Sequence, residues 1–173
     1  MIDRLLNISS RVISFYAETP AAGRDIMHTP SVSHFTRMIS EAEGMSDKEC
    51  ELHEISAWLH DIGCPVARDK YGTSKPPYQE EEGRALVHEW LDGDDSFTKD
   101  EVDWLADVVG THHRVAESKR LHFEPLYEAD LIVNIFEGSY KDPQSFVDSG
   151  AVSTKTGLKL FRELFNVTIR QQY

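Results

Sequence analysis

Four side chains that can bind a metal ion stand in apolar stretches of the chain that have helical spacing. His60 and Asp61 end the apolar run "AWLHDIG", His34 lies in "SVSHFTRM", and Asp130 lies in "YEADLIVN". A carboxylate that is buried without a partner costs several kcal/mol, so each aspartate needs a cation or a dense set of hydrogen bonds. One divalent metal ion would satisfy all four groups at once. We therefore expect His34, His60, Asp61 and Asp130 to be its ligands.

Two imidazoles and two carboxylates form a mixed nitrogen and oxygen donor set. Such a set suits Mn, Fe, Co, Ni or Zn, and it suits Mg less well. His112 and His113 in "VVGTHHRV", together with Glu80, are candidates for a second metal or for a phosphate. His112 is the stronger of the two histidines, because Val108 and Val109 place position 112 near the buried face of its helix. We expect one ion, with two as the alternative.

The composition is that of an ordinary globular domain with an acidic surface. The chain has 173 residues, of which 40% are hydrophobic and 28% charged, and its formal net charge is -12. This length allows one domain with a sizeable core. The absence of an apolar run of about 18 residues, and of a basic region before an apolar block, predicts a cytoplasmic protein without a membrane partner.

The net charge limits the possible binding partners, and the cysteine count indicates the redox compartment. The net charge of -12 would repel polymeric nucleic acid, whereas a small anion at a local positive patch remains compatible with it. The two cysteines fit a reducing compartment and are too few for a disulfide framework.

Apolar spacing and capping signals predict an all-α protein. "SDKE" and "TKDE" match capping boxes that open two of the helices, the first of which we expect to stop at Gly63. His28 is expected in a loop, without a role. Residues 64–78 hold three prolines and a glycine, which predicts an ordered loop or lid. The expected helices cover residues 2–17, 31–43, 46–62, 80–92, 98–109, 125–137 and 155–165.

We expect a single domain over residues 1–173. Its metal-site core would span about residues 25–137, and C-terminal helices would occupy residues 143–166. Apolar side chains of the last helix would close the core or form a homodimer interface; they are Leu158, Phe161, Leu164 and Phe165.

The order His34, then His60-Asp61, then Asp130 resembles the HD-domain metal-dependent phosphohydrolase superfamily. The similarity runs from "HFTRM" through "WLHDIG" and "VGTHH" to "EADLIVN", which is nearly the whole chain, and "KYGTSKPPYQEEEG" is similar to small bacterial members that are mostly uncharacterised. The resemblance implies a single-domain helical bundle of the HD type. It also implies that these four residues are the metal ligands.

The activity that the resemblance implies is hydrolysis of a phosphoester by a metal-bound hydroxide, with Asp61 orienting the water. The substrate would be a small phosphorylated metabolite or a nucleotide. Because two aspartates cancel the double charge of the metal, the phosphate needs cations from elsewhere. The candidates for this contact are Arg37, Arg68, Lys70, Lys75 and Arg114.

The chain departs from the dinuclear members of this superfamily. Those members, such as the HD-GYP phosphodiesterases, carry a further histidine where this chain has Gln79, four residues before Gly83. The GYP segment is also missing, so cyclic-dinucleotide hydrolysis is not supported. Two alternatives stay open: an HD-fold di-iron oxygenase, and a non-catalytic regulatory or binding module that a metal stabilises.

Overall fold

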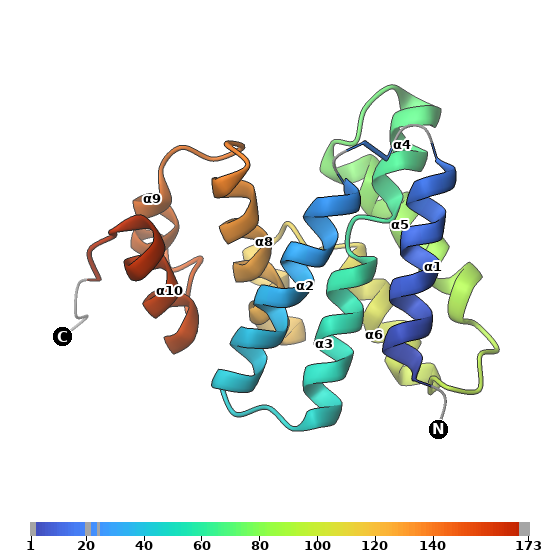
Figure 1. Cartoon of the computed structure of the whole chain (residues 1–173), viewed down its shortest axis with the longest axis horizontal. Coiled ribbons are helices and arrows are strands. Elements are labelled where there is room, and N and C mark those ends of the chain that lie inside the picture. The colour runs from blue at the N-terminus through green and yellow to red at the C-terminus, as the bar shows by residue number, and fades with distance from the viewer. Residues whose placement is uncertain (1–2, 20–21, 24, 170–173) are drawn as a thin grey trace.

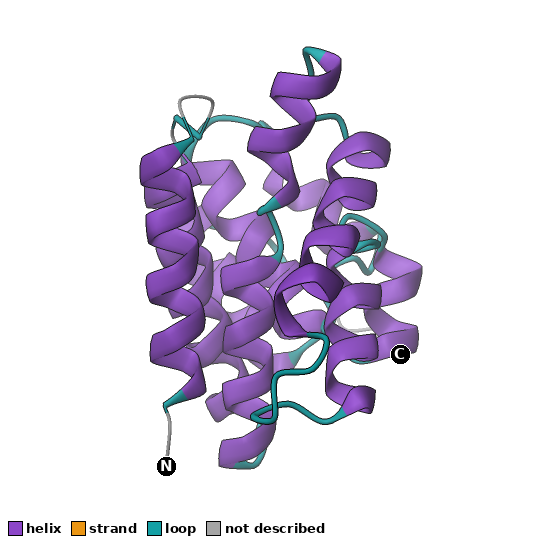
Figure 2. Ribbon diagram, turned by 90° about the vertical axis from the view of Figure 1, so that its right-hand side faces the viewer, coloured by secondary structure: helices purple, strands orange, loops and turns teal. Residues whose placement is uncertain are grey.

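The computed structural model describes residues 3–19, 22–23 and 25–169, and within these residues it is helical and contains no strand (Figure 2). This confirms the all-α prediction. The helices are α1 (Arg4–Glu18), α2 (Asp25–Ala42), α3 (Asp47–Leu59), α4 (Gly63–Tyr71), α5 (Pro76–Leu91), α6 (Lys99–Val109), α7 (Val115–Leu121), α8 (Glu124–Phe136), α9 (Pro143–Asp148) and α10 (Lys155–Phe165).

The helices pack around two hydrophobic clusters. The first is built by α1, α3, α5 and α6 and includes Leu59, Val87 and Leu105, and the second is built mainly by α2, α8 and α10 and includes Ile39 and Phe161. Burying one such side chain stabilises the fold by about 1.5–3 kcal/mol. Helix α2 packs against both α3 and α8 and so joins the two halves (Figure 1).

Two helices begin at the predicted capping boxes. The Ser46 hydroxyl accepts a hydrogen bond from the Glu49 amide at the start of α3, and Thr98 does the same with Glu101 at the start of α6. The side chain of each glutamate reaches back to the cap backbone. These caps satisfy amides that have no partner within the helix and fix where each helix begins.

The segment predicted as a loop or lid at 64–78 is mostly helical, so that prediction is wrong. Pro65 lies in the first turn of α4, and Pro76 is the first residue of α5. A proline in a first turn costs no hydrogen bond, because the amide it lacks would have no partner there. Gly72 ends α4 in the left-handed conformation, with φ 72°, so residues 72–75 alone separate the two helices.

The α3–α4 junction also differs from the prediction. Helix α3 ends at Leu59, a short turn follows, and Gly63 begins α4 instead of capping α3. A Cβ atom at Gly63 would overlap the carbonyl oxygen of Gln79 and lie 2.5 Å from the amide nitrogen of Gly83. Glycine at position 63 therefore allows the backbones of α4 and α5 to touch.

Helix α2 begins at Asp25, six residues before the predicted start. It continues through Pro30, which removes one hydrogen bond from the helix interior. A proline is common in the first turn of a helix and uncommon further inside it, so a helix that continues through Pro30 is not what the sequence pattern favours. The extension places His28 on a helix and on the buried side of it.

The C-terminal helices are held to α8 by a buried carboxylate. Glu128 of α8 accepts hydrogen bonds from the amides of Ser153 and Thr154, at 2.6 and 2.9 Å, just before α10. Phe161 is fully buried and closes the second cluster, whereas Leu164 is exposed. A homodimer through this helix remains a prediction.

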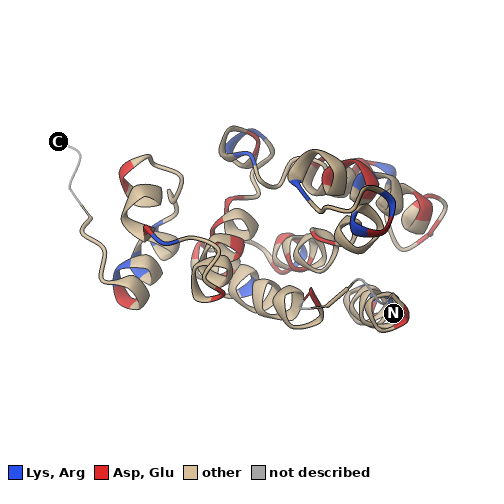
Figure 3. Ribbon diagram, turned by 90° about the horizontal axis from the view of Figure 1, so that it is seen from above, with Lys and Arg blue, Asp and Glu red and all other residues tan. Residues whose placement is uncertain are grey.

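Charged residues are spread over several helices (Figure 3). Among the described residues, no helix is both long enough and apolar enough to span a bilayer.

Candidate metal centre

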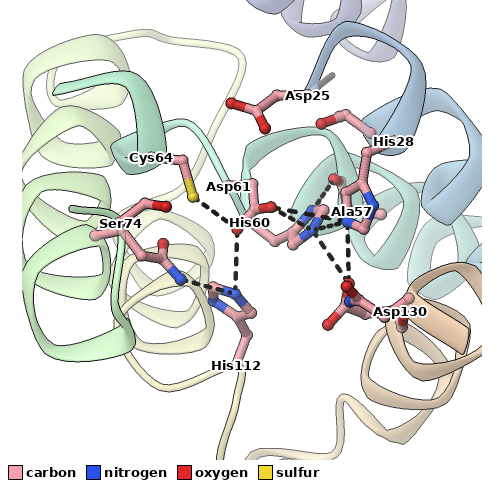
Figure 4. Close-up of polar contacts among 12 residues, drawn as sticks. Asp25, His28, Ala57, His60, Asp61, Cys64, Ser74, His112 and Asp130 are labelled. Atoms are coloured by element: carbon pink, nitrogen blue, oxygen red, sulfur yellow. Dashed lines mark hydrogen bonds and ion pairs between the residues drawn. The ribbon is translucent and has the colours of Figure 1, made fainter. Parts of the chain in front are cut away.

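His60 occupies the turn that ends α3 and is fully buried. Its Nδ1 donates a hydrogen bond to the carbonyl oxygen of Ala57 at 2.7 Å. This bond fixes the tautomer, because a neutral imidazole that donates from Nδ1 carries its lone pair on Nε2. The metal-binding nitrogen of His60 thus faces Asp61 and Asp130 (Figure 4).

His28 points its Nε2 into the same place from the first turns of α2. Its Nδ1 lies 3.1 Å from the Glu137 carboxylate, to which it donates. Its Nε2 lies 3.1 Å from Asp130 Oδ1 and 3.7 Å from Asp61 Oδ2. A carboxylate behind a ligating histidine is a common arrangement in metal sites, because it orients the ring and makes the other nitrogen a better ligand.

Asp130 completes the cluster from α8. Its Oδ1 lies 3.7 Å from the Nε2 of His60 and accepts a hydrogen bond from Asn134 Nδ2 at 2.8 Å. Asn134 stands one helical turn further along, so the two side chains share a face of α8. The amide therefore holds the carboxylate in position.

These atoms have the spacing of ligands around one ion. The Nε2 atoms of His28 and His60 and the Oδ1 of Asp130 lie 3.1 to 3.7 Å from one another and form one group with metal-ligand spacing. Asp61 Oδ2 lies 3.6 and 3.7 Å from the same two nitrogens, but Asp61 is not part of that group. Two atoms about 2.1 Å from one ion are about 3.0 Å apart at a right angle and about 3.4 Å apart at a tetrahedral angle. The Nε2 atoms of His28 and His60 are 3.3 Å apart, so their lone pairs need a cation between them. The buried groups therefore fit a metal ion.

His34, predicted as the first histidine ligand, does not lie in this cluster. Its side chain is exposed on α2, beside Arg37, Met38 and Glu41. Six residues separate it from His28, which is a rotation of about 240° around a helix at 3.6 residues per turn. His28 takes the place that was predicted for His34, and the prediction for His34 is corrected accordingly.

His112 extends the cluster on the other side of Asp61. It is buried in the turn after α6, its Nδ1 donates to the Val109 carbonyl at 2.9 Å, and its Nε2 lies 3.6 Å from Asp61 Oδ1. His60, Asp61 and His112 thereby form a second group with metal-ligand spacing, and this group shares His60 with the first.

The other second-metal candidates lie further out. His113 is partly exposed, and its Nδ1 lies 3.3 Å from Glu80. Glu80 is buried and also accepts a hydrogen bond from Arg114 at 2.7 Å. Glu80 thus pairs with His113 and Arg114 and is not part of the group that Asp61 forms with His60 and His112.

The electrostatics of the cluster favour a cation. Burial opposes protonation of His60, but Asp61 and Asp130 outweigh it and raise the pKa of His60 to about 9. Burial works against ionisation of both aspartates, yet the neighbouring imidazoles hold their pKa values below the usual range. In the metal-free protein a proton thus sits where a metal would, and metal binding would release it.

A cavity of about 110 Å³ opens beside the cluster, and Arg68 of α4 lines it. Arg68 pairs with Asp25, another lining residue. His113 also lines it, whereas the other predicted cationic contacts to the phosphate do not. Lys70 pairs with Glu82 on the surface.

The remaining three predicted contacts lie apart from the cavity for different reasons. Arg37 pairs with Glu41 on the exposed face of α2, and Arg114 pairs with Glu80. Lys75 is exposed in the short link before α5.

Sequence reasoning missed six side chains that shape this site: Asp25, His28, Ser74, Asn134, Glu137 and Tyr140. The spacing of Asp130 and Asn134 at i and i+4 was a usable signal for one of them. His28 and Glu137 are brought together only by the packing of α2 on α8, which the sequence pattern did not specify.

Comparison with family models, with curated proteins and with solved structures found no match to this chain. The site is therefore interpreted from its own geometry.

Proposed function

We propose that this chain is a metal-dependent phosphohydrolase of the HD-domain type. The observation that supports this proposal is the buried group His28, His60 and Asp130, with Asp61 beside it, in which both Nδ1 atoms are engaged elsewhere and both Nε2 atoms face the carboxylates. A divalent ion bound there would lower the pKa of a water molecule and polarise a phosphoryl oxygen. The mixed donor set suits Mn, Fe, Co, Ni or Zn.

We assign Asp61 the role of the carboxylate that orients the water. Its Oδ2 is shared with the two histidines, while its Oδ1 accepts a hydrogen bond from Cys64 Sγ at 3.3 Å. The Oδ1 side can therefore orient a water molecule and hold its proton. The water oxygen would form the new bond to phosphorus, and the ester oxygen would leave with the electron pair of the broken bond and take up the proton.

Arg68 is the cation that can orient the phosphate. Its guanidinium lines the same cavity as Asp61, and Asp25 holds it in place. A guanidinium donates in a fixed fork that matches phosphate oxygens.

The surroundings of His112 favour one ion over two. Gln79 directs its Nε2 at the Nε2 of His112, at 3.3 Å. Because His112 donates from Nδ1, its Nε2 carries the lone pair, which the amide proton of Gln79 occupies. A second ion would have to displace this hydrogen bond.

The test is metal content and turnover in the same preparations. Elemental analysis of wild type should give about one ion per chain, and Asp61→Ala and Asp130→Ala should lose it. The loaded wild type should hydrolyse at least one small phosphomonoester, and both variants should lose this activity by a factor of at least about 100. Circular dichroism of each variant would check that the helices remain.

Two outcomes would replace the proposal. Metal binding without turnover, together with a ligand that raises the melting temperature, would indicate a regulatory module. Two irons per chain with a mixed-valence EPR signal would indicate an oxygenase.

A further inference from the structure

The cavity beside Asp61 is small and entirely polar in character. Its volume is about 110 Å³, and every lining residue carries a polar or ionisable group, including Ser74, Gln79, Asn134 and Tyr140. Cavities that bind nucleobases or drug-sized ligands are larger, at about 300–1,000 Å³, and mostly apolar. The size and lining therefore favour a compact hydrophilic ligand.

Two residues that line this cavity each carry a buried polar atom without a hydrogen-bond partner. Among the described residues, four buried side-chain atoms lack a hydrogen bond, and two of them, Gln79 Oε1 and Arg68 Nε, belong to residues that line this cavity. A buried polar atom without a partner costs about 1–3 kcal/mol. We take two such atoms, on residues that line one cavity, as a reason to expect a ligand that supplies the partners.

The orientation of the Gln79 amide follows from its neighbours. His112 donates from Nδ1 to Val109, so its Nε2 can only accept, and the amide atom that faces it must be the nitrogen. The Oε1 of Gln79 is then the atom left unpaired. It is a neutral acceptor, which suits a hydroxyl group of the ligand.

Arg68 offers the complementary group. Its Nη2 is engaged with Asp25 and its Nη1 lies 3.5 Å from Ser74, whereas its Nε has no hydrogen-bond partner. Three carboxylates line the cavity, those of Asp25, Asp61 and Asp130, and one guanidinium with one divalent ion would balance their charge. Each negative charge on a ligand would then be uncompensated, so the site opposes a polyphosphate more strongly than a single phosphate group.

From these features we infer that the substrate is a small phosphomonoester with a hydroxyl group near the phosphate, and that it is not a nucleotide. Arg68 Nε donates to a phosphate oxygen, and Gln79 Oε1 accepts a hydrogen bond from the hydroxyl. This inference rests on the proposed phosphohydrolase function, because it takes the phosphorus to lie beside Asp61. Gln79 is then a specificity-determining residue.

The experiment compares two ligands that differ by one hydroxyl. Titration calorimetry with zinc-loaded protein would measure the binding of 2-hydroxyethylphosphonate and ethylphosphonate, neither of which has an ester bond to hydrolyse, and of adenosine monophosphate. In wild type we expect the hydroxylated ligand to bind about 10-fold more tightly than ethylphosphonate, the usual effect of one satisfied hydrogen bond. Adenosine monophosphate should bind at least about 10-fold more weakly than the hydroxylated ligand.

Three variants test the role of Gln79. In Gln79→Met, which has no side-chain acceptor of this kind, the affinity ratio of the two phosphonates should fall to about one. In Gln79→Glu, which keeps an acceptor oxygen, the ratio should persist, because the added charge acts on both ligands. Glu81→Met, an exposed position two residues along α5, is the matched control and should keep the wild-type ratio.

A wild-type ratio near one, an unchanged ratio in Gln79→Met, or tighter binding of adenosine monophosphate would each overturn the inference. The wild-type comparison needs no variant, so it stands even if a substitution disturbs folding. A parallel assay of glycerol phosphate hydrolysis separates the two proposals. Selective phosphonate binding without any hydrolysis would reject the phosphohydrolase and keep the recognition by Gln79. Hydrolysis without selective binding would keep the phosphohydrolase and reject the recognition by Gln79.

Discussion

The Nε2 of His28 lies 3.1 Å from Oδ1 of Asp130, although 102 residues separate them along the chain. One residue belongs to the start of α2 and the other to α8, so this contact ties the two helices that frame the site. A metal bound between the two side chains would hold the same helices together. Metal binding and the stability of the α2–α8 interface are therefore expected to be linked.

Removal of the metal should lower the unfolding temperature. A ligand present at 100 times its dissociation constant stabilises the native state by about 2.7 kcal/mol, which in a protein of this size corresponds to several degrees. Thermal unfolding followed by circular dichroism, with and without chelator, would measure this. The unfolding temperature of Asp130→Ala should not respond to chelator; an equal response in both proteins would contradict the site.

His28→Ala should abolish metal binding, and His34→Ala should leave it intact. The two histidines lie on the same helix, but His28 is buried at the cluster and His34 is exposed. Metal content by elemental analysis distinguishes them directly. Loss of the metal in His34→Ala, with retention in His28→Ala, would restore the original sequence prediction.

Glu137→Gln should weaken metal binding by about 10–100-fold without removing a ligand. The Glu137 carboxylate accepts the Nδ1 hydrogen bond of His28 and so orients the ring. Competition with a chromophoric chelator would give the dissociation constant. Glu163→Gln, an exposed position on α10, serves as the control and should match wild type.

Gly63→Ala should destabilise the fold by about 3 kcal/mol or more, because its new methyl group would overlap the backbone of α5. Gly83→Ala should lower the free energy of unfolding by less. Its Cβ would meet a side-chain methyl group of Val109 at 2.7 Å, and that side chain can move. Urea unfolding of both variants provides the comparison. Similar small losses of unfolding free energy in the two variants would show that the backbones of α4 and α5 do not touch.

Glu101 should make stability depend on pH in the acid range. Burial disfavours its ionised form, but the Thr98 amide, Lys48 and Arg4 outweigh burial and lower its pKa from 4.5 to about 2. A carboxyl group with a lowered pKa stabilises the native state above its unfolded pKa, and this stabilisation is lost as the pH falls through the folded value. The relevant window is thus pH 4.5 down to 2.

Comparison of wild type with Glu101→Gln tests this. Urea unfolding should show wild type to be more stable by about 1–2 kcal/mol at pH 7, and the difference should shrink between pH 4.5 and pH 2. A difference that is independent of pH would assign the effect to packing instead of charge.

Local signals predicted most of the fold and part of the site. The capping boxes at Ser46 and Thr98 fix helix starts through contacts within four residues, which is why the pattern found both. The pair His60-Asp61 and Asp130 were also found, because a carboxylate among apolar residues stands out in the sequence.

The choice between His28 and His34 could not be made from the sequence. It depended on whether α2 continues through Pro30 and on which face of α2 meets α8, and both are decided by packing between distant segments. The prolines of residues 64–78 could not be placed from the sequence either. A proline is equally typical of a loop and of the first turn of a helix, and only the structure shows that Pro65 and Pro76 lie in first turns.

The position of Glu128 on α8 has a consequence for how the protein is made. This carboxylate is fully buried two residues before Asp130, and its partners are the amides of Ser153 and Thr154. On the ribosome, α8 emerges before those partners exist, and a buried carboxylate without partners is costly. Helix α8 is therefore expected to pack in place only after the segment around residue 154 has been synthesised, so that the proposed metal site would form late on a nascent chain.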